Sequence, residues 1–154
     1  MWDQKQGERF AFEEALVKMY FPGFRLRYDH NRNPYFAGWI GTKGRRNYYK
    51  LRLELSECFP DSKPGLFVES PQQLPMYDGA ETINSLGLSH AYHVYGTGDN
   101  GFVKICHTND WDPSCTCVMA LLRGALWTEG YEHHLRTGET IHQYLRELEK
   151  QLSE

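Results

Sequence analysis

The first 70 residues carry apolar patterns typical of one helix followed by four strands. Residues 8–20 repeat apolar side chains at helical spacing with Glu13 and Glu14 on another face, which predicts an amphipathic helix that Pro22-Gly23 ends. Period-two alternation and turn residues predict strands at residues 24–29, 35–41, 49–55 and 66–69. The third is the most regular, since apolar and polar residues alternate along its whole length. The pattern predicts an antiparallel meander with one buried face.

Residues 71–113 differ from what precedes them because they lack a clear period. They contain three prolines and several glycines, and short helical or strand pieces can hide among them. A connection of this length is unusual in a compact domain and is often functional. We therefore look for chemistry in this segment first.

Helical patterns return after the irregular segment. Asp112-Pro113 is typical of an N-cap followed by proline at the first helical position. Two apolar stripes follow, one before and one after Thr137-Gly138. Their members are Val118, Leu121, Leu122, Ala125 and Leu126, then Ile141, Tyr144, Leu145, Leu148 and Leu152. The predicted fold is α+β, a single domain over 1–154 with an N-terminal helix, a four-stranded antiparallel meander, a long active-site segment and C-terminal helices.

Composition narrows the function classes. The 154 residues are 40% hydrophobic and 24% charged, which is typical of one globular domain. A net charge of −3 and the lack of a long basic run disfavour nucleic acid as a partner. No apolar stretch reaches the roughly 18 residues of a membrane span, and residues 1–8 lack a signal-peptide core. We expect a cytoplasmic protein with reduced thiols, in which the four cysteines are catalytic, metal-binding or buried.

Cys106 is the candidate nucleophile. It ends a short apolar run that follows Gly101 inside the irregular segment, and His107 comes next. The thiolate is the reactive form of cysteine, and nearby cations or donors favour it, so Lys104 and His107 are candidates to assist. The alternative is a small buried apolar side chain, which is common for free cysteine.

The other cysteines have weaker patterns. Cys115 and Cys117 could join Cys106 and His107 in a metal site, but the one-residue gap suits zinc poorly and helix-face packing explains the pair better. Cys58 is expected in the core or at a strand edge.

The positions of the histidines allow several interpretations of their roles. His90 and His93 precede a glycine-rich stretch, 96–101, that lacks the lysine of a phosphate loop. His93 either orients backbone near the cysteine or is a satisfied structural residue. His133 and His134, beside Glu132, are expected on solvated surface. The chain has neither a His-Glu-x-x-His zinc motif nor a Gly-x-Ser-x-Gly elbow.

An ordered set of residues resembles one known family. The set runs through Trp39 and Gly41, Tyr49 to Leu55, Phe59-Pro60, Pro64, Pro71, His93, Gly101, Ile105-Cys106, Trp111-x-Pro113, Trp127, Tyr131-Glu132 and Thr137-Gly138. From about residue 8 to 145 the chain resembles the ubiquitin-conjugating enzymes, and it is most similar to their bacterial branch, found with ubiquitin-like modifiers or antiviral signalling operons.

The resemblance implies a mechanism. Cys106 would take the C-terminal glycine of a modifier from an adenylating activating enzyme as a thioester, and a nucleophile on a target protein would then attack it. His93 matches the first residue of the family's His-Pro-Asn motif, whereas Val94 and Tyr95 replace the proline and the asparagine. Tyr95, Asn100 and Asn109 are the candidates to replace that oxyanion donor.

The resemblance also assigns supporting roles and leaves alternatives. Trp111 and Pro113 are expected to support the groove, with His107 and Asn100 also placed among its binding residues. The interval from the cysteine to the tryptophan is shorter than in eukaryotic members, which implies a rebuilt loop on the acceptor side.

No cofactor or metal is expected, and the implied setting is bacterial antiphage defence. A non-catalytic adaptor that binds through its aromatics and N-terminal helix is one alternative, although the retained cysteine argues against it. A small Cys/His zinc-binding domain is the other.

Overall fold

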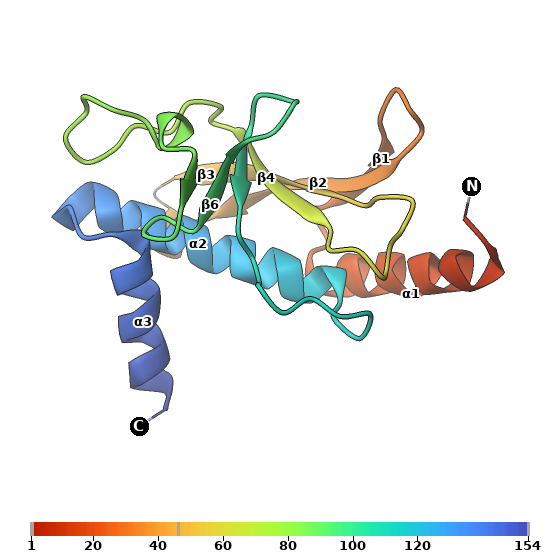
Figure 1. The fold of residues 1–154 in the computed structure, drawn as a ribbon. Coiled ribbons are helices and arrows are strands. Elements are labelled where there is room, and N and C mark those ends of the chain that lie inside the picture. The colour runs from red at the N-terminus through yellow and green to blue at the C-terminus, as the bar shows by residue number, and fades with distance from the viewer. Residues whose placement is uncertain (1, 46, 154) are drawn as a thin grey trace.

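The computed structural model describes residues 2–45 and 47–153, without the side chain of Arg45. Three α-helices accompany one antiparallel sheet whose strands differ in length (Figure 1). The helices are α1 (Gln4–Tyr20), α2 (Cys117–Thr137) and α3 (Ile141–Leu152). The strands are β1 (Arg25–Tyr28), β2 (Pro34–Gly41), β3 (Tyr48–Glu54), β4 (Gly65–Ser70), β5 (Leu88–Ser89), β6 (Val94–Thr97) and β7 (Val103–Ile105). Short 3-10 turns occupy Lys43–Arg45 and Ile83–Ser85.

The described strands form one seven-stranded sheet in the order β1-β2-β3-β4-β7-β6-β5. The α+β class, the N-terminal helix, the antiparallel sheet and the two C-terminal helices agree with the sequence prediction. The predicted count of four strands is wrong. Strands β5, β6 and β7 lie inside the segment expected to be irregular, and β7 extends the meander by pairing Ile105 with Leu66 of β4. These strands have two to four residues each, too few to give a readable period.

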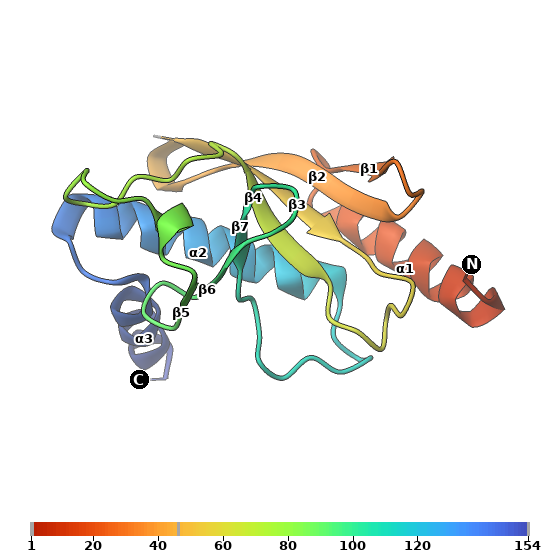
Figure 2. The same cartoon turned by 45° about the horizontal axis from the view of Figure 1, so that its top comes forward.

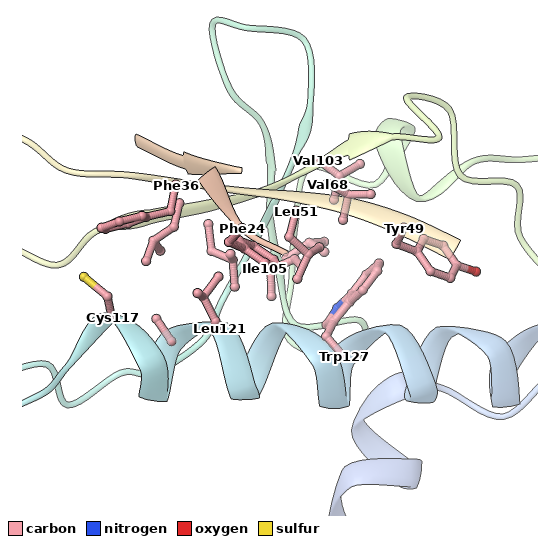
Figure 3. Packing of buried hydrophobic residues seen from close by; sticks show 14 of the residues in the cluster. Phe24, Phe36, Tyr49, Leu51, Val68, Val103, Ile105, Cys117, Leu121 and Trp127 are labelled. Carbon is pink, nitrogen blue, oxygen red and sulfur yellow. The ribbon is translucent and has the colours of Figure 1, made fainter. Parts of the chain in front are cut away.

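Helices α1 and α2 lie on the same side of the sheet, and Figure 2 shows both beneath it. Apolar side chains of the central strands point towards α2 and fill the space between the two layers (Figure 3). Leu51, Val68 and Ile105 meet Leu121 and Trp127 there, and none is more than 1% exposed. This packing fixes β7 over α2, and therefore fixes the residue that follows β7.

Both α1 and α2 begin elsewhere than predicted. Helix α1 starts four residues earlier than predicted, because Asp3 and Gln6 form a capping box. Helix α2 starts at Cys117, capped by Thr116, whose hydroxyl accepts from the Met119 amide at 3.2 Å.

The predicted N-cap at Asp112-Pro113 is therefore wrong. Asp112 instead closes a turn, where its carboxylate accepts from the Ser114 amide at 2.7 Å.

Helix α3 leaves the body of the molecule. Gly138 ends α2 with a φ of 81°, and Thr140 and Gln143 form a capping box that starts α3. Figure 1 shows α3 pointing away from the sheet, with the C-terminus at its free end. None of the helices in the described ranges combines the length and the apolar character needed to cross a membrane.

Candidate active site around Cys106

Cys106 lies directly after β7, at the edge of a cavity between α2 and α3. Its amide donates to the His93 carbonyl at 2.8 Å, and this bond fixes the backbone just beyond the end of β7. The side chain is half-buried. The cavity has a volume of about 470 Å³, and Leu126, Leu145 and Leu148 give it an apolar wall. A partly exposed thiol on a concave surface is accessible to an incoming group.

Tyr95 is the closest polar neighbour of the sulfur. The Cys106 Sγ lies 3.1 Å from the Tyr95 hydroxyl, where the thiol S–H donates to the tyrosine oxygen. Burial, and then the hydrogen bond and charge of Cys106, raise the pKa of Tyr95 to about 12. The tyrosine therefore keeps its proton at neutral pH, and its hydroxyl can donate a hydrogen bond to a sulfur that has lost its own proton.

Lys63 completes a chain of polar groups behind Tyr95. Its ammonium donates to the Tyr95 hydroxyl oxygen at 2.6 Å and to the Thr108 carbonyl at 2.8 Å. The same nitrogen lies 4.7 Å from the centre of the Tyr95 ring. Lys63 comes from the loop between β3 and β4, far from Cys106 in the sequence, and the sequence analysis did not single it out.

Asn109 is the second polar neighbour. Its Oδ1 lies 3.4 Å from the Cys106 Sγ, and the thiol donates to it. A carboxamide offers both an acceptor and two donors, so Asn109 can serve either protonation state of the sulfur by turning over. Of the three residues considered as replacements for the family's asparagine, Tyr95 and Asn109 therefore lie at the thiol.

Asn100 lies elsewhere. It occupies the turn between β6 and β7, where its Oδ1 accepts from the Phe102 amide at 2.9 Å. That turn is at the opposite end of β7 from Cys106. The structure therefore does not bring Asn100 to the site.

His93 contacts the cysteine through its backbone. It has a φ of 51°, an uncommon left-handed conformation for a residue with a side chain, and this turns its carbonyl towards the Cys106 amide. Its imidazole Nε2 instead lies 2.9 Å from the Nδ1 of His142, with the ring of His90 beside both. Burial, then the charges of His142 and His90, lower the pKa of His93. His93 thus orients backbone, as one of the two interpretations proposed, while its ring holds the start of α3.

His107 and Trp111 support the loop that carries Cys106. The His107 ring is buried, and its Nε2 pairs with the Pro64 carbonyl at 2.8 Å instead of with the thiol. Burial lowers the pKa of His107, which favours the neutral ring. Trp111 packs edge-on against His107, and its indole N–H donates to the Pro60 carbonyl at 2.8 Å. The contacts of His107 therefore do not assist the thiol.

Lys104 lies near the site without a hydrogen bond to the thiol. Its ammonium is 5.8 Å from the centre of the Tyr95 ring and 5.8 Å from that of Phe67. Within residues 2–45 and 47–153, its contacts near the site are with these rings and not with Cys106. The lysine that hydrogen-bonds to a neighbour of the thiol is therefore Lys63, and not Lys104 as the sequence suggested.

The remaining cysteines lie away from Cys106. Cys117 is fully buried at the start of α2, where its amide donates to Glu13, which agrees with the packing interpretation. Cys58 is exposed in the turn after β3, so its expected place in the core or at a strand edge is wrong. Within residues 2–45 and 47–153, no three His, Cys, Asp or Glu side chains gather closely enough to hold a metal ion. The geometry therefore does not support the Cys/His zinc-binding alternative.

The expected solvated surface around His134 is also wrong. His134 is 2% exposed, and its two ring nitrogens pair with the Tyr77 amide and the Glu139 carbonyl. Glu132 is buried too, and it accepts from the Asn47 side chain at 2.6 Å. Both residues therefore fix turns against α2, and neither is part of the site.

Comparison with known proteins adds no assignment. No family model, no curated protein and no solved structure matches the chain. The geometry around Cys106 and the ordered residues of the sequence are therefore the basis for any proposed function.

Proposed function

We propose that the protein is a cysteine-dependent acyltransferase of the ubiquitin-conjugating type, which carries a ubiquitin-like modifier on Cys106 and transfers it to a target protein. The single observation behind this proposal is the Cys106 thiol itself, half-buried beside a cavity and within hydrogen-bond distance of Tyr95 and Asn109. The order of elements also supports it, since a helix, an antiparallel meander, the cysteine and two helices follow in the sequence expected for that family.

The proposed chemistry has two steps. The Cys106 thiolate attacks the C-terminal carbonyl of a modifier that is activated as an acyl adenylate, a C–S bond forms and AMP leaves. An amine on the target protein then attacks the thioester, the C–S bond breaks, and the amine proton passes to solvent or to the departing thiolate. Each step develops negative charge on oxygen or sulfur beside Tyr95 and Asn109.

Tyr95 is the proposed donor to that charge. It occupies the position of the family's asparagine in the ordered motif, and its hydroxyl is 3.1 Å from the sulfur. Removing one such donor from an acyl-transfer site typically costs about 10² to 10³ in rate. We therefore propose Tyr95 as the main donor and Asn109 as the second.

The proposed partners follow from the chemistry. An adenylating activating enzyme supplies the acyl group, a ubiquitin-like protein ending in glycine is the modifier, and a protein amine accepts it. The proposed setting, a bacterial antiphage system, rests on the sequence resemblance. It predicts that Cys106→Ala in the native host removes protection in a plaque assay, whereas Cys58→Ala retains it.

A trapping experiment in the native host tests the proposal. Cys106→Ser would hold the modifier as an oxyester that thiols do not cleave, while the wild type would hold it as a thioester that thiols do cleave. Both are purified under acid, non-reducing conditions, and their intact masses are measured with and without dithiothreitol. Cys58→Ser is the matched control, since Cys58 is exposed but has no such surroundings. An adduct that persists in Cys106→Ala would contradict the proposal.

A non-catalytic adaptor is the second candidate, and one observation favours it. Phe12, Met19 and Tyr20 of α1 are 54%, 70% and 62% exposed, which is an apolar surface open to a partner protein. The adaptor predicts that Cys106→Ala keeps both partner binding and cellular phenotype, whereas replacing Phe12 and Met19 with serine removes them.

A further inference from the structure

We propose that Lys63 is a positioning residue for the Cys106 thiol, and that it acts by holding the Tyr95 hydroxyl in the orientation that donates to a deprotonated sulfur. This inference deepens the proposed function and rests on it for the transfer step, but its effect on the thiol exists without any modifier.

The orientation follows from what each group can donate and accept. An ammonium has three donors and no acceptor, so the 2.6 Å contact between Lys63 and Tyr95 makes the tyrosine oxygen the acceptor. One hydroxyl proton and one further lone pair remain on that oxygen. The thiol uses the lone pair, as the S–H donates to it at 3.1 Å. A thiolate has nothing to donate, so Tyr95 then turns its proton towards the sulfur while Lys63 still holds its oxygen.

The charge of Lys63 strengthens this arrangement. A hydroxyl whose oxygen accepts from a cation becomes a stronger donor, because successive hydrogen bonds polarise each other. Lys63 therefore acts on the sulfur through the Tyr95 hydroxyl.

Hydrogen bonds to the loop after Cys106 hold the loop that carries Lys63 in place. The Pro60 carbonyl accepts from Trp111 and the Pro64 carbonyl pairs with His107, each at 2.8 Å. Lys63 also donates to Thr108, two residues after the cysteine. The β3–β4 loop and the loop after Cys106 are thus joined at three points, and this gives Trp111 and His107 a purpose beyond packing.

The rate of alkylation by iodoacetamide tests the inference, because the thiolate, not the thiol, attacks this neutral reagent and displaces its iodide. The rate is followed for each cysteine by peptide mass spectrometry between pH 6 and pH 10, with exposed Cys58 as the internal reference. Lys63→Met should slow alkylation of Cys106 by about tenfold at pH 7 and move its profile to higher pH, the effect of about 1.4 kcal/mol. Lys63→Arg, which keeps the charge and the donors, should recover most of the rate.

Further variants separate the mechanism from general effects. Lys104→Met removes a neighbouring charge that lies 5.8 Å from the centres of the Tyr95 and Phe67 rings, and it should change the rate less than twofold. Tyr95→Phe should slow alkylation as much as Lys63→Met does, and adding Lys63→Met to Tyr95→Phe should then slow it less than twofold further. Lys63→Gln, which also lacks the charge, replaces Lys63→Met if that variant does not fold.

Two results would overturn the inference. One is a wild-type alkylation profile in Lys63→Met and Lys63→Gln. The other is an equal loss from Lys63→Met with and without the Tyr95 hydroxyl, which would show that the lysine does not act through the tyrosine. A modifier thioester that forms normally alongside either result would leave the proposed function standing. An altered profile with no thioester would instead remove the proposed function and keep the inference.

Discussion

Glu13 is the residue that joins α1 to the start of α2. Its carboxylate is fully buried, accepts from the Cys117 amide at 2.9 Å and pairs with Arg9 at 3.2 Å. The Arg9 guanidinium continues to the Cys115 carbonyl at 2.6 Å. An anion at the first turn of a helix is favourable, because free backbone N–H groups point at it.

We predict that Glu13→Ala lowers the free energy of unfolding by about 3 kcal/mol, since it leaves a buried amide and a part-buried guanidinium without their partner. Urea unfolding measures this difference. Glu14→Ala, on the exposed side of the same helix, is the control and should stay within about 0.5 kcal/mol of the wild type. A loss below about 1 kcal/mol in Glu13→Ala would show that the junction does not depend on this carboxylate.

The close contact between β2 and Phe24, the residue that precedes β1, depends on a glycine. A methyl group on Gly38 would lie 2.5 Å from the Phe24 ring and 2.8 Å from the Phe24 backbone. Backbone cannot move aside as a flexible side chain can, so the strand itself would shift.

Gly38→Ala should therefore lower the free energy of unfolding by about 2 kcal/mol or more. Gly23→Ala is the matched control, because it flanks the same phenylalanine and a methyl group there meets nothing within 4 Å. Chemical unfolding of the two variants side by side gives the comparison, and equal stabilities would contradict the close approach.

The attachment of α3 depends on neutral histidines. The His142 ring pairs with His93, and its amide donates to the Ala91 carbonyl at 2.9 Å. Burial, then the charges of His90 and Arg146, lower the pKa of His142, and burial chiefly lowers that of His93. A lowered folded-state pKa means that the unfolded chain binds the proton first as the pH falls. The contribution of the cluster is thus complete above about pH 6.5 and is lost as the pH falls below that value.

We predict that the wild type loses stability between pH 7.5 and pH 5.5, and that His142→Phe loses less over the same range because it removes one titrating partner. Urea unfolding at both pH values checks the difference. An identical loss in the two proteins would place the pH dependence outside this cluster.

Across the whole molecule, the sequence predicted those strands and helices whose own residues form a regular apolar pattern. Alternation along residues 49–55 and the apolar stripe around Leu121 predicted the central strand and the second helix, because one face of each is buried in the core. Strand β7 was missed because Val103, Lys104 and Ile105 are a single alternation, and they become a strand only by pairing with β4. The same limit explains Lys63, which lies 32 residues from Tyr95 and has no local pattern that signals their contact.

Cys106 is proposed to carry an acyl group, and detection of a thioester on it is the direct test. The protein is incubated with ATP, a candidate activating enzyme and its modifier taken from the neighbouring genes, and then run on a non-reducing gel. We expect a higher-mass band that dithiothreitol removes, that requires ATP, that is absent from Cys106→Ala and that persists in Cys58→Ala. A band of the same intensity in Cys106→Ala, or no band while the activating enzyme itself becomes charged with modifier, would contradict the proposal.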